Sequence, residues 1–330
     1  FFWFMGFYGE LLWFRSLGYG IRFFREIGAK VATAAAGGIA AWLYIRLLTL
    51  RLPADKKKGG RFLRRGGSII GAVWGYMNWE LILRFFHRVD AGTADPVFGK
   101  NISFYLFTLP FLDLLYGFFL FFTILVLLGV LALTYLRVKE DNVVVQKPES
   151  LPDMPALSTT LYLSAGMGIL VLAAGKYLRR FHLMYSQWGA VHGPGWTDIH
   201  VRLPAYWITV VLTALLAAVV FIPFLRNKLF SMLKWVRNDA ARPVRVIVTS
   251  GTVVLGVWFL FLSILPGLLQ WLRVEPNEIT LEKPYIKHNI EFTRRAFNLD
   301  KVEEKQFPAS ETFTRKLVSG NQDLFSNVRL

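Results

Sequence analysis

Long apolar runs alternate with short polar connections along the whole chain. A helix that crosses a membrane needs about 20 predominantly apolar residues, and seven segments reach or approach that length. They are residues 1–14, which form an incomplete segment, 28–50, 67–86, 109–136, 157–178, 203–225 and 244–270. The pattern therefore predicts an all-α integral membrane protein with about seven transmembrane helices.

The same pattern divides the chain into two domains. Residues 1–272 are expected to form the transmembrane helical domain. Residues 273–330 begin with an amphipathic stretch, with Ile286 and Phe297 on its apolar stripe, which predicts an exit helix. About thirty residues follow, too few to bury a core alone, so we expect them to begin an extracytoplasmic domain. Both ends, starting with Phe1 inside an apolar run, indicate a piece of a longer protein.

Charge is better explained by membrane topology than by nucleic acid binding. The formal net charge is +16, but the basic residues stand in short runs between apolar segments rather than on one polar domain. The two strongest runs are "RLPADKKKGGRFLRR" (51–65) and "RNKLFSMLKWVRNDAARPVR" (226–245). Because basic loops favour the cytoplasmic side, both are expected inside, and the loops around Tyr19, Asp95 and His192 are expected outside.

The available residue types limit the chemistry. The chain contains no cysteine, which excludes disulfides, thiolate catalysis and Cys-ligated metal centres within it. It has no phosphate-binding loop, dinucleotide fingerprint or hydrolase elbow. We therefore expect no catalytic residue, no cofactor and no nucleic acid partner.

Histidines gather on the expected outer side, where only His192 and His200, with Asp198 between them, are close in sequence. A metal site needs three or four converging ligands, so this trio is the one candidate for a metal or acid–base site. The alternative is that these histidines form hydrogen bonds at the membrane interface. The pattern favours the second interpretation.

One acidic residue, Glu80 in "YMNWELILRF", falls inside an expected membrane helix. An ionisable group at that depth is a functional hypothesis by default. Glu80 is therefore a candidate for proton or ion passage. The alternative is an ion pair with a basic neighbour across the bundle.

Four stretches together form a recognisable signature. They are "WFRSLGYGIRFF" (13–24), "DPVFGKNISFYLFTLPF" (95–111), "GPGWTDIHVRLPA" (193–205) and "EPNEITLEKPYIKHNIEFTRRAFNLD" (275–300). In this order they resemble uncharacterised protein family 0182, and the match spans almost the whole chain. Where many relatives have a tyrosine this chain has Trp196, which is a conservative aromatic exchange.

The resemblance implies a longer, multi-pass protein of the bacterial cytoplasmic membrane, with about seven N-terminal helices and a large extracytoplasmic domain. It implies no activity, substrate or catalytic residue. The residues of these stretches that we single out as structural motifs are Asp95, Pro96, Gly99, Pro110, Trp196, Asp198, Pro284, Tyr285 and Asn289.

The second stretch also has a physical interpretation of its own. Asp95 is expected to bond its own backbone and to start a tight turn through Pro96 and Gly99. Residues 101–107, "NISFYLF", are expected to lie extended or shallow at the membrane interface. Pro110 is expected to restart a helix in its first turn, where a missing N–H is tolerated.

These observations favour a non-catalytic membrane platform that anchors an extracytoplasmic domain, in envelope assembly or in lipid or solute transport. Two alternatives stay open. One is an accessory subunit of a larger membrane complex, such as an energy-converting one, and the other is a membrane enzyme that uses the outer His, Asp and Glu groups. The expected partners are membrane lipids, which the basic loops can also bind, and other proteins or further copies of the chain.

Overall fold

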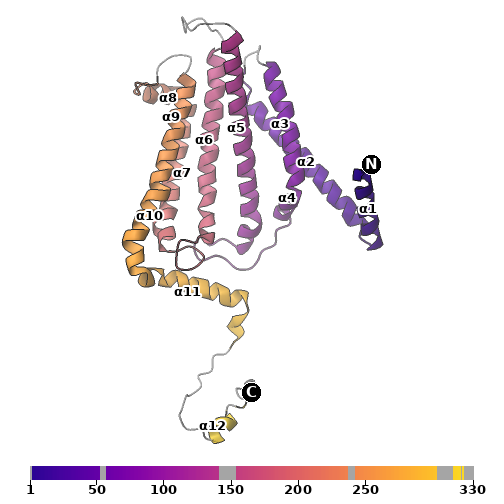
Figure 1. Cartoon of the computed structure of the whole chain (residues 1–330), viewed down its shortest axis with the longest axis vertical. Coiled ribbons are helices and arrows are strands. Elements are labelled where there is room, and N and C mark those ends of the chain that lie inside the picture. The colour runs from indigo at the N-terminus through magenta and orange to yellow at the C-terminus, as the bar shows by residue number, and fades with distance from the viewer. Residues whose placement is uncertain are drawn as a thin grey trace. The chain divides into compact units, whose positions relative to one another are not determined.

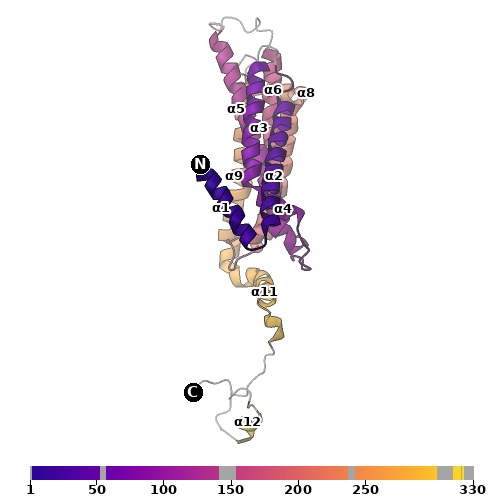
Figure 2. The same ribbon diagram turned by 90° about the vertical axis from the view of Figure 1, so that its right-hand side faces the viewer.

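A computed structural model of the chain describes residues 2–52, 57–140, 154–236, 242–302, 315–320 and 322. The chain divides into two units, Phe1–Ile286 and Lys287–Leu330. The first unit is a bundle of helices (Figures 1 and 2). The described residues contain no strand, and their one extended pairing is an isolated bridge between Ala94 and Asn101.

Four helices come first along the chain. They are α1 (Phe2–Ser16), α2 (Gly20–Leu48), α3 (Lys57–Met77) and α4 (Trp79–Phe86). Helix α1 packs against α2 through aromatic rings, since those of Phe7 and Phe14 lie 5.2 and 5.6 Å from the ring of Phe23. Figure 2 shows α1 beside α2.

Helices α2 and α3 pack antiparallel with their backbones in contact, because glycines face each other across the interface. A Cβ atom on Gly75 would lie 2.1 Å from the carbonyl oxygen of Thr33, and one on Gly37 would lie 2.3 Å from the carbonyl oxygen of Gly71. Small residues allow helix backbones to approach closely in a membrane. This interface therefore has no room for a larger side chain at these positions.

Three long helices stand next to one another in the centre of the bundle (Figure 1). They are α5 (Leu109–Glu140), α6 (Met154–Arg179) and α7 (Leu203–Phe221), with the short 3-10 helix η3 (Phe181–Tyr185) after α6. Aromatic rings lie over small residues between them. A Cβ atom on Gly175 of α6 would lie 2.4 Å from the ring of Tyr116 in α5.

The remaining elements follow α7. They are α8 (Pro223–Phe230), α9 (Arg242–Phe259), α10 (Leu265–Leu269), η7 (Glu275–Asn277), α11 (Glu278–Ala296), η8 (Leu299–Lys301) and α12 (Arg315–Gly320). The boundary between the two units falls inside α11, so only the part of α11 up to Ile286 belongs to the bundle.

Each of the four π-helical turns among the described residues ends two positions before a proline. The turns are η1 (Phe104–Thr108), η4 (Asp198–Arg202), η5 (Leu260–Ile264) and η6 (Gln270–Val274), and the prolines are Pro110, Pro204, Pro266 and Pro276. In each case the residue before the proline donates its N–H five residues back, as Leu109 does to Phe104. A proline lacks an N–H and its ring clashes with the carbonyl of residue i−4, and the wider turn accommodates both defects.

This arrangement corrects the expectation for residues 101–107. Residues 102–108 are helical rather than extended, and they run directly into α5. The π-turn allows the helix to continue into Pro110, so the proline does not restart it.

The core lies between the helices of the bundle unit. One cluster around Ile45, Phe122 and Leu161 joins α2, α5 and α6. A second, around Val220 and Val246, joins α7 to α9. These side chains are each at most 2% exposed.

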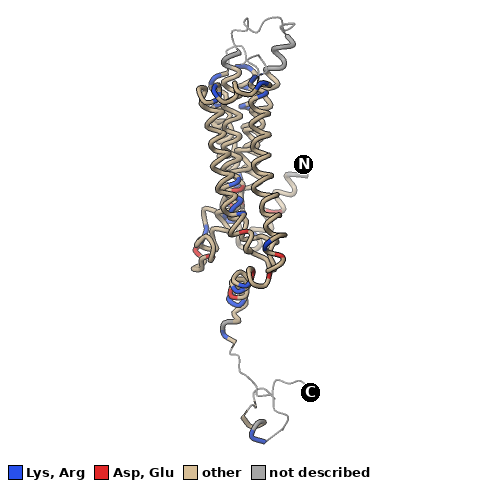
Figure 3. Tube along the Cα trace, turned by 90° about the vertical axis from the view of Figure 1, so that its left-hand side faces the viewer, with Lys and Arg blue, Asp and Glu red and all other residues tan. Residues whose placement is uncertain are grey.

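Lysine and arginine gather at one end of the bundle, where α2 ends and α3 begins (Figure 3). We call this the basic end and define it by Arg46, Lys57, Arg64, Arg226 and Arg245. The opposite end holds the turn at Asp95, the loop between α6 and α7 and the beginning of α11 (Figure 1). Charged residues of both signs occur there (Figure 3).

Among the described residues, five helical runs are long and apolar enough to cross a membrane. They are Gly20–Leu48, Phe104–Leu133, Leu157–Arg179, Asp198–Phe221 and Arg242–Ala296. The expected segment 67–86 is divided between α3 and α4, which meet at Asn78, where the side-chain Nδ2 donates to the carbonyl of Trp74 over 2.8 Å. Helix α3 begins as early as Lys57, so charged residues fill its first turns and dilute its apolar character.

Candidate functional site

The carboxylate of Asp95 is buried in a turn at the opposite end of the bundle. Its Oδ1 accepts the N–H groups of Val97 and Phe98 over 2.9 and 2.5 Å. Its Oδ2 accepts the N–H of Lys100 over 2.7 Å and the hydroxyl of Tyr105 over 2.9 Å. Four donors use the carboxylate fully, so Asp95 holds the turn together and has no acceptor left for a ligand.

The neighbouring motif residues shape the same turn. Pro96 follows Asp95 directly, and Gly99 has φ +62°, a left-handed conformation that favours glycine. Asn101 continues the turn, because its Oδ1 accepts the N–H of Ser103 over 2.8 Å. The turn is therefore built from its own residues.

Glu282, near the start of α11, carries the most unusual carboxylate of this end. Its side chain is 1% exposed, and its Oε1 accepts the backbone N–H of Trp196 over 3.0 Å. A Cβ atom on Gly195 would lie 2.9 Å from both carboxylate oxygens, and one on Gly189 would lie 3.2 Å from Oε2. The two glycines therefore form a cradle for the carboxylate. We call Gly189, Gly195, Trp196 and Glu282 the glutamate cradle.

Oε2 of Glu282 has no hydrogen-bond partner in the described structure. Glu282 lies beyond the apolar part of the run Arg242–Ala296, because charged residues recur from Arg273 onward. Burial raises the pKa of the Glu282 carboxyl because desolvation disfavours its charged form, while the N–H of Trp196 lowers the pKa and the charges of Asp198 and Glu278 raise it further.

Asp198 orders the loop that forms the cradle. Its side chain is 1% exposed, its Oδ1 accepts a 2.6 Å hydrogen bond from Arg202, and its Oδ2 accepts the N–H of Gly195 over 3.2 Å. The guanidinium group of Arg202 lies 4.8 Å from the ring of Trp188 and 3.4 Å from the hydroxyl of Ser186. This partly buried ion pair ties the residues before and after Gly195 to each other.

The ring of Trp196 packs against two neighbouring side chains. Its ring stacks on that of His200 at 4.7 Å, and the guanidinium of Arg273 lies 5.0 Å from its centre. Nδ1 of His200 donates to the carbonyl of Trp196 over 3.1 Å, and the hydroxyl of Tyr285 lies 3.4 Å from the same nitrogen. Trp196 and Tyr285 thus connect the loop to η6 and α11.

The structure gives the predicted metal candidates separate partners. Asp198 is bonded to Arg202 and the backbone, while His200 is bonded to Trp196. Within the described residues, no group of three or more His, Cys, Asp or Glu side chains is arranged to hold a metal ion. His192 lies in the same loop.

The remaining predicted residues fall elsewhere. Glu80 lies in α4, where its carboxylate pairs with Arg84 of the same helix, and both side chains are more than half exposed. Pro284 lies inside α11, and Asn289 belongs to the second unit.

Two pairings at this end are not predicted by the sequence. Glu282 was one acidic residue among several on the expected outer side, and nothing local indicates that two glycines 87 and 93 positions earlier surround it. The other is the pair of His182 and Asp113, whose Nε2 and Oδ2 atoms lie 2.7 Å apart. The one sequence feature compatible with a close approach is the Gly-Pro-Gly before Trp196, because glycine leaves room for a neighbouring group, but it does not identify Glu282 as that group.

The helical bundle and its apolar runs define the class of this chain, which is a helical membrane protein. The family described as "Uncharacterised protein family (UPF0182)" matches residues 62–330, and the chain belongs to that family. The resemblance to this family is thereby confirmed, and three of the four signature stretches lie within the matched residues.

Several relatives carry the same family name. A UPF0182 protein of Geobacter sp. (strain M21) is 30% identical in an alignment of 353 positions that covers 99% of this chain and 37% of the relative. Those of Pelobacter propionicus and Cupriavidus necator are 36% and 34% identical, each over 80% of this chain and 27% of the relative. The chain therefore spans about a third of the length of these relatives. No solved structure matches it.

Proposed function

We propose that this chain is the membrane anchor of a longer bacterial protein. In this proposal it is a non-catalytic platform of about seven helices in the cytoplasmic membrane, and it positions the part of the protein beyond α11 outside the cytoplasm as a component of the cell envelope. The observation that carries the proposal is the contact of Glu282 with Trp196, because it ties the exit helix to a loop of the bundle.

The use of polar groups at the opposite end supports a structural role. The carboxylates of Asp95 and Asp198 are buried and bonded to the backbone of their own loops. A catalytic acid or base must be able to contact a substrate, whereas Asp95 and Asp198 hold loops in place. The signature residues of this end therefore fit a docking platform better than an active site.

The charge distribution supports the orientation. Basic residues gather at the end where α2 ends and α3 begins (Figure 3), and basic loops favour the cytoplasm. The helix count of seven adds α1 and α3 to the five apolar runs. Helix α3 has 21 residues, which rise about 30 Å and match the hydrocarbon thickness.

The proposal is tested by comparing Glu282→Ala with Glu278→Ala in the full-length protein in membranes. Both variants remove a glutamate from the first turns of α11, but Glu278 is exposed, and it is Glu282 that accepts the N–H of Trp196. We expect Glu282→Ala to accelerate proteolytic cleavage after residue 286 severalfold, because α11 loses its attachment. Glu278→Ala should behave as the wild type. Equal cleavage of all three proteins would overturn the anchor role of this contact.

A further inference from the structure

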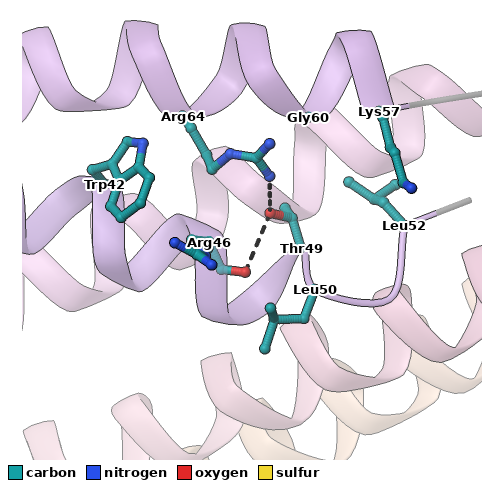
Figure 4. A pocket seen from close by; sticks show the side chains of 8 residues that line it. All are labelled: Trp42, Arg46, Thr49, Leu50, Leu52, Lys57, Gly60 and Arg64. Atoms are coloured by element: carbon teal, nitrogen blue, oxygen red, sulfur yellow. Dashed lines mark hydrogen bonds between the residues drawn. The ribbon is translucent and has the colours of Figure 1, made fainter. Parts of the chain in front are cut away.

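A cavity of about 330 Å³ lies at the basic end, between the end of α2 and the beginning of α3. Figure 4 shows the eight residues around it. They are Trp42, Arg46, Thr49, Leu50, Leu52, Lys57, Gly60 and Arg64. Its size falls in the range of small-molecule sites, and it lies far from the glutamate cradle at the other end.

Three of the lining side chains are cations, and each approaches from a different point of the wall. Arg46 belongs to α2, while Lys57 and Arg64 belong to α3 (Figure 4). Within the described part of the chain, no aspartate or glutamate lines the cavity or pairs with these three groups. The concentration of positive charge therefore favours an anionic occupant.

Contacts inside the wall hold the two arginines in position. The guanidinium of Arg46 lies 5.1 Å from the ring centre of Trp42, and Nη1 of Arg64 donates to the hydroxyl of Thr49 over 3.2 Å. Thr49 is itself anchored, since its hydroxyl donates to the carbonyl of Ile45 over 2.7 Å. An arginine has five N–H donors, so both keep donors for a bound anion, and their planar fork suits a phosphate group.

The apolar part of the wall indicates what carries the phosphate. Leu43 and Leu47 lie on the last turns of α2, and Leu50, which lines the cavity, follows at the same spacing just after the helix ends; the three are 53%, 55% and 63% exposed. They form an apolar stripe that leads away from the cavity along the helix, next to Arg46. A free phosphate gains nothing from contact with apolar leucines, whereas acyl chains are stabilised by packing against them.

We propose that this cavity binds the phosphate group of an anionic phospholipid, with Arg46, Arg64 and Lys57 as its donors and the leucine stripe against its acyl chains. The inference rests on the membrane location in the proposed function but not on the anchoring of α11. Basic pockets between membrane helices are a general means of binding such headgroups.

The test uses the full-length protein, stripped of lipid in a neutral detergent and titrated with phosphatidylglycerol while native mass spectrometry counts bound lipid. The variant Arg46→Gln/Arg64→Gln should weaken binding at least about tenfold, because two charge-assisted contacts are lost. The matched control is Arg61→Gln/Arg65→Gln, which removes the same charge from exposed positions of α3 outside the cavity. It should stay within about twofold of the wild type.

Equal weakening in both double variants, or none in either, would overturn the site. If inorganic phosphate at millimolar concentration displaced the lipid as well as an anionic lipid does, the occupant would be a free phosphate and the lipid assignment would be wrong. If the Arg46→Gln/Arg64→Gln protein does not fold, Lys57→Gln replaces it, with Lys58→Gln as control. Lys57 is exposed at the start of α3, so its loss should weaken the binding of phosphatidylglycerol severalfold without unfolding the bundle, and unchanged binding would count against the site.

This outcome is independent of the experiment on Glu282. If the lipid site behaves as expected but Glu282→Ala does not accelerate proteolysis, only the anchor contact is refuted. If Glu282→Ala accelerates proteolysis but Arg46→Gln/Arg64→Gln binds phosphatidylglycerol as the wild type does, only the lipid site is refuted.

Discussion

The Oε1 atom of Glu282 lies 3.0 Å from the backbone nitrogen of Trp196, which is 86 residues earlier in the chain. The contact joins two of the four signature stretches, 193–205 and 275–300, at one point. It also buries a carboxylate whose second oxygen has no partner in the described structure. Burying a charged carboxylate with incomplete hydrogen bonding is costly. The ionised form of Glu282 therefore destabilises the attachment of α11, and this effect depends on pH.

The stability of the protein should therefore depend on the protonation of Glu282. Its pKa is higher in the folded protein than the ordinary value of 4.5 because of burial, so the folded state binds more protons than the unfolded state above that pH. The free energy of unfolding contributed by this group should fall as the pH rises from about 4.5 through the raised pKa. Glu282→Gln, which cannot ionise, should lose this dependence.

Thermal unfolding in neutral detergent between pH 4.5 and 8 measures the effect. The difference in unfolding temperature between Glu282→Gln and the wild type should grow in favour of the variant as the pH rises. Glu275→Gln serves as the control, because Glu275 is exposed and, unlike Glu278, is not among the groups that raise the pKa of Glu282. A constant difference across the pH range would show that Glu282 keeps an ordinary pKa.

Gly195→Ala should destabilise the cradle. The added Cβ would lie 2.9 Å from both oxygens of Glu282, so the carboxylate or the loop must move, at a cost of about 1–3 kcal/mol. Gly251→Ala in α9 is the control, because a Cβ there meets no atom within 4 Å and alanine favours a helix. Unfolding temperatures of the two variants decide the matter, and an equally stable Gly195→Ala protein would contradict the cradle.

The contact between α2 and α3 should be equally intolerant of a methyl group. Gly75→Ala places a Cβ 2.1 Å from the carbonyl oxygen of Thr33, which is backbone and cannot swing aside. We expect a loss of at least about 2 kcal/mol in the free energy of unfolding. Gly66→Ala, in the same helix but with no atom within 4 Å of its Cβ, should be neutral or slightly stabilising. Similar stabilities of both variants would mean that the helices do not pack this closely.

The orientation of the bundle is accessible to thiol labelling, because this chain contains no cysteine of its own. Val89 at the opposite end and Met232 at the basic end are 75% and 77% exposed, so each is suited to a single substitution by cysteine. A membrane-impermeant maleimide should label Val89→Cys in intact spheroplasts, and Met232→Cys only after permeabilisation. The reverse pattern would place the basic end outside and refute the proposed orientation.

Much of the local structure follows from the sequence because its causes are local. Apolar runs of membrane length predict most of the long helices, and the residues of "DPVFGKN" predict a turn that Asp95 closes onto its own backbone. The extended conformation expected for residues 101–107 was wrong. Proline signals tell where a regular α-helix cannot continue, but a π-turn lets the chain stay helical up to Pro110.

The helical membrane class, the family and the two basic loops could be read from the chain alone, since these depend on composition and on neighbours a few residues apart. Only the tertiary structure decided that Glu282 meets Gly189, Gly195 and Trp196, and that Arg46 and Arg64 share one cavity. Such pairings depend on how helices cross and on which glycines permit contact. No periodicity along the chain encodes those distances, because they arise when distant segments pack.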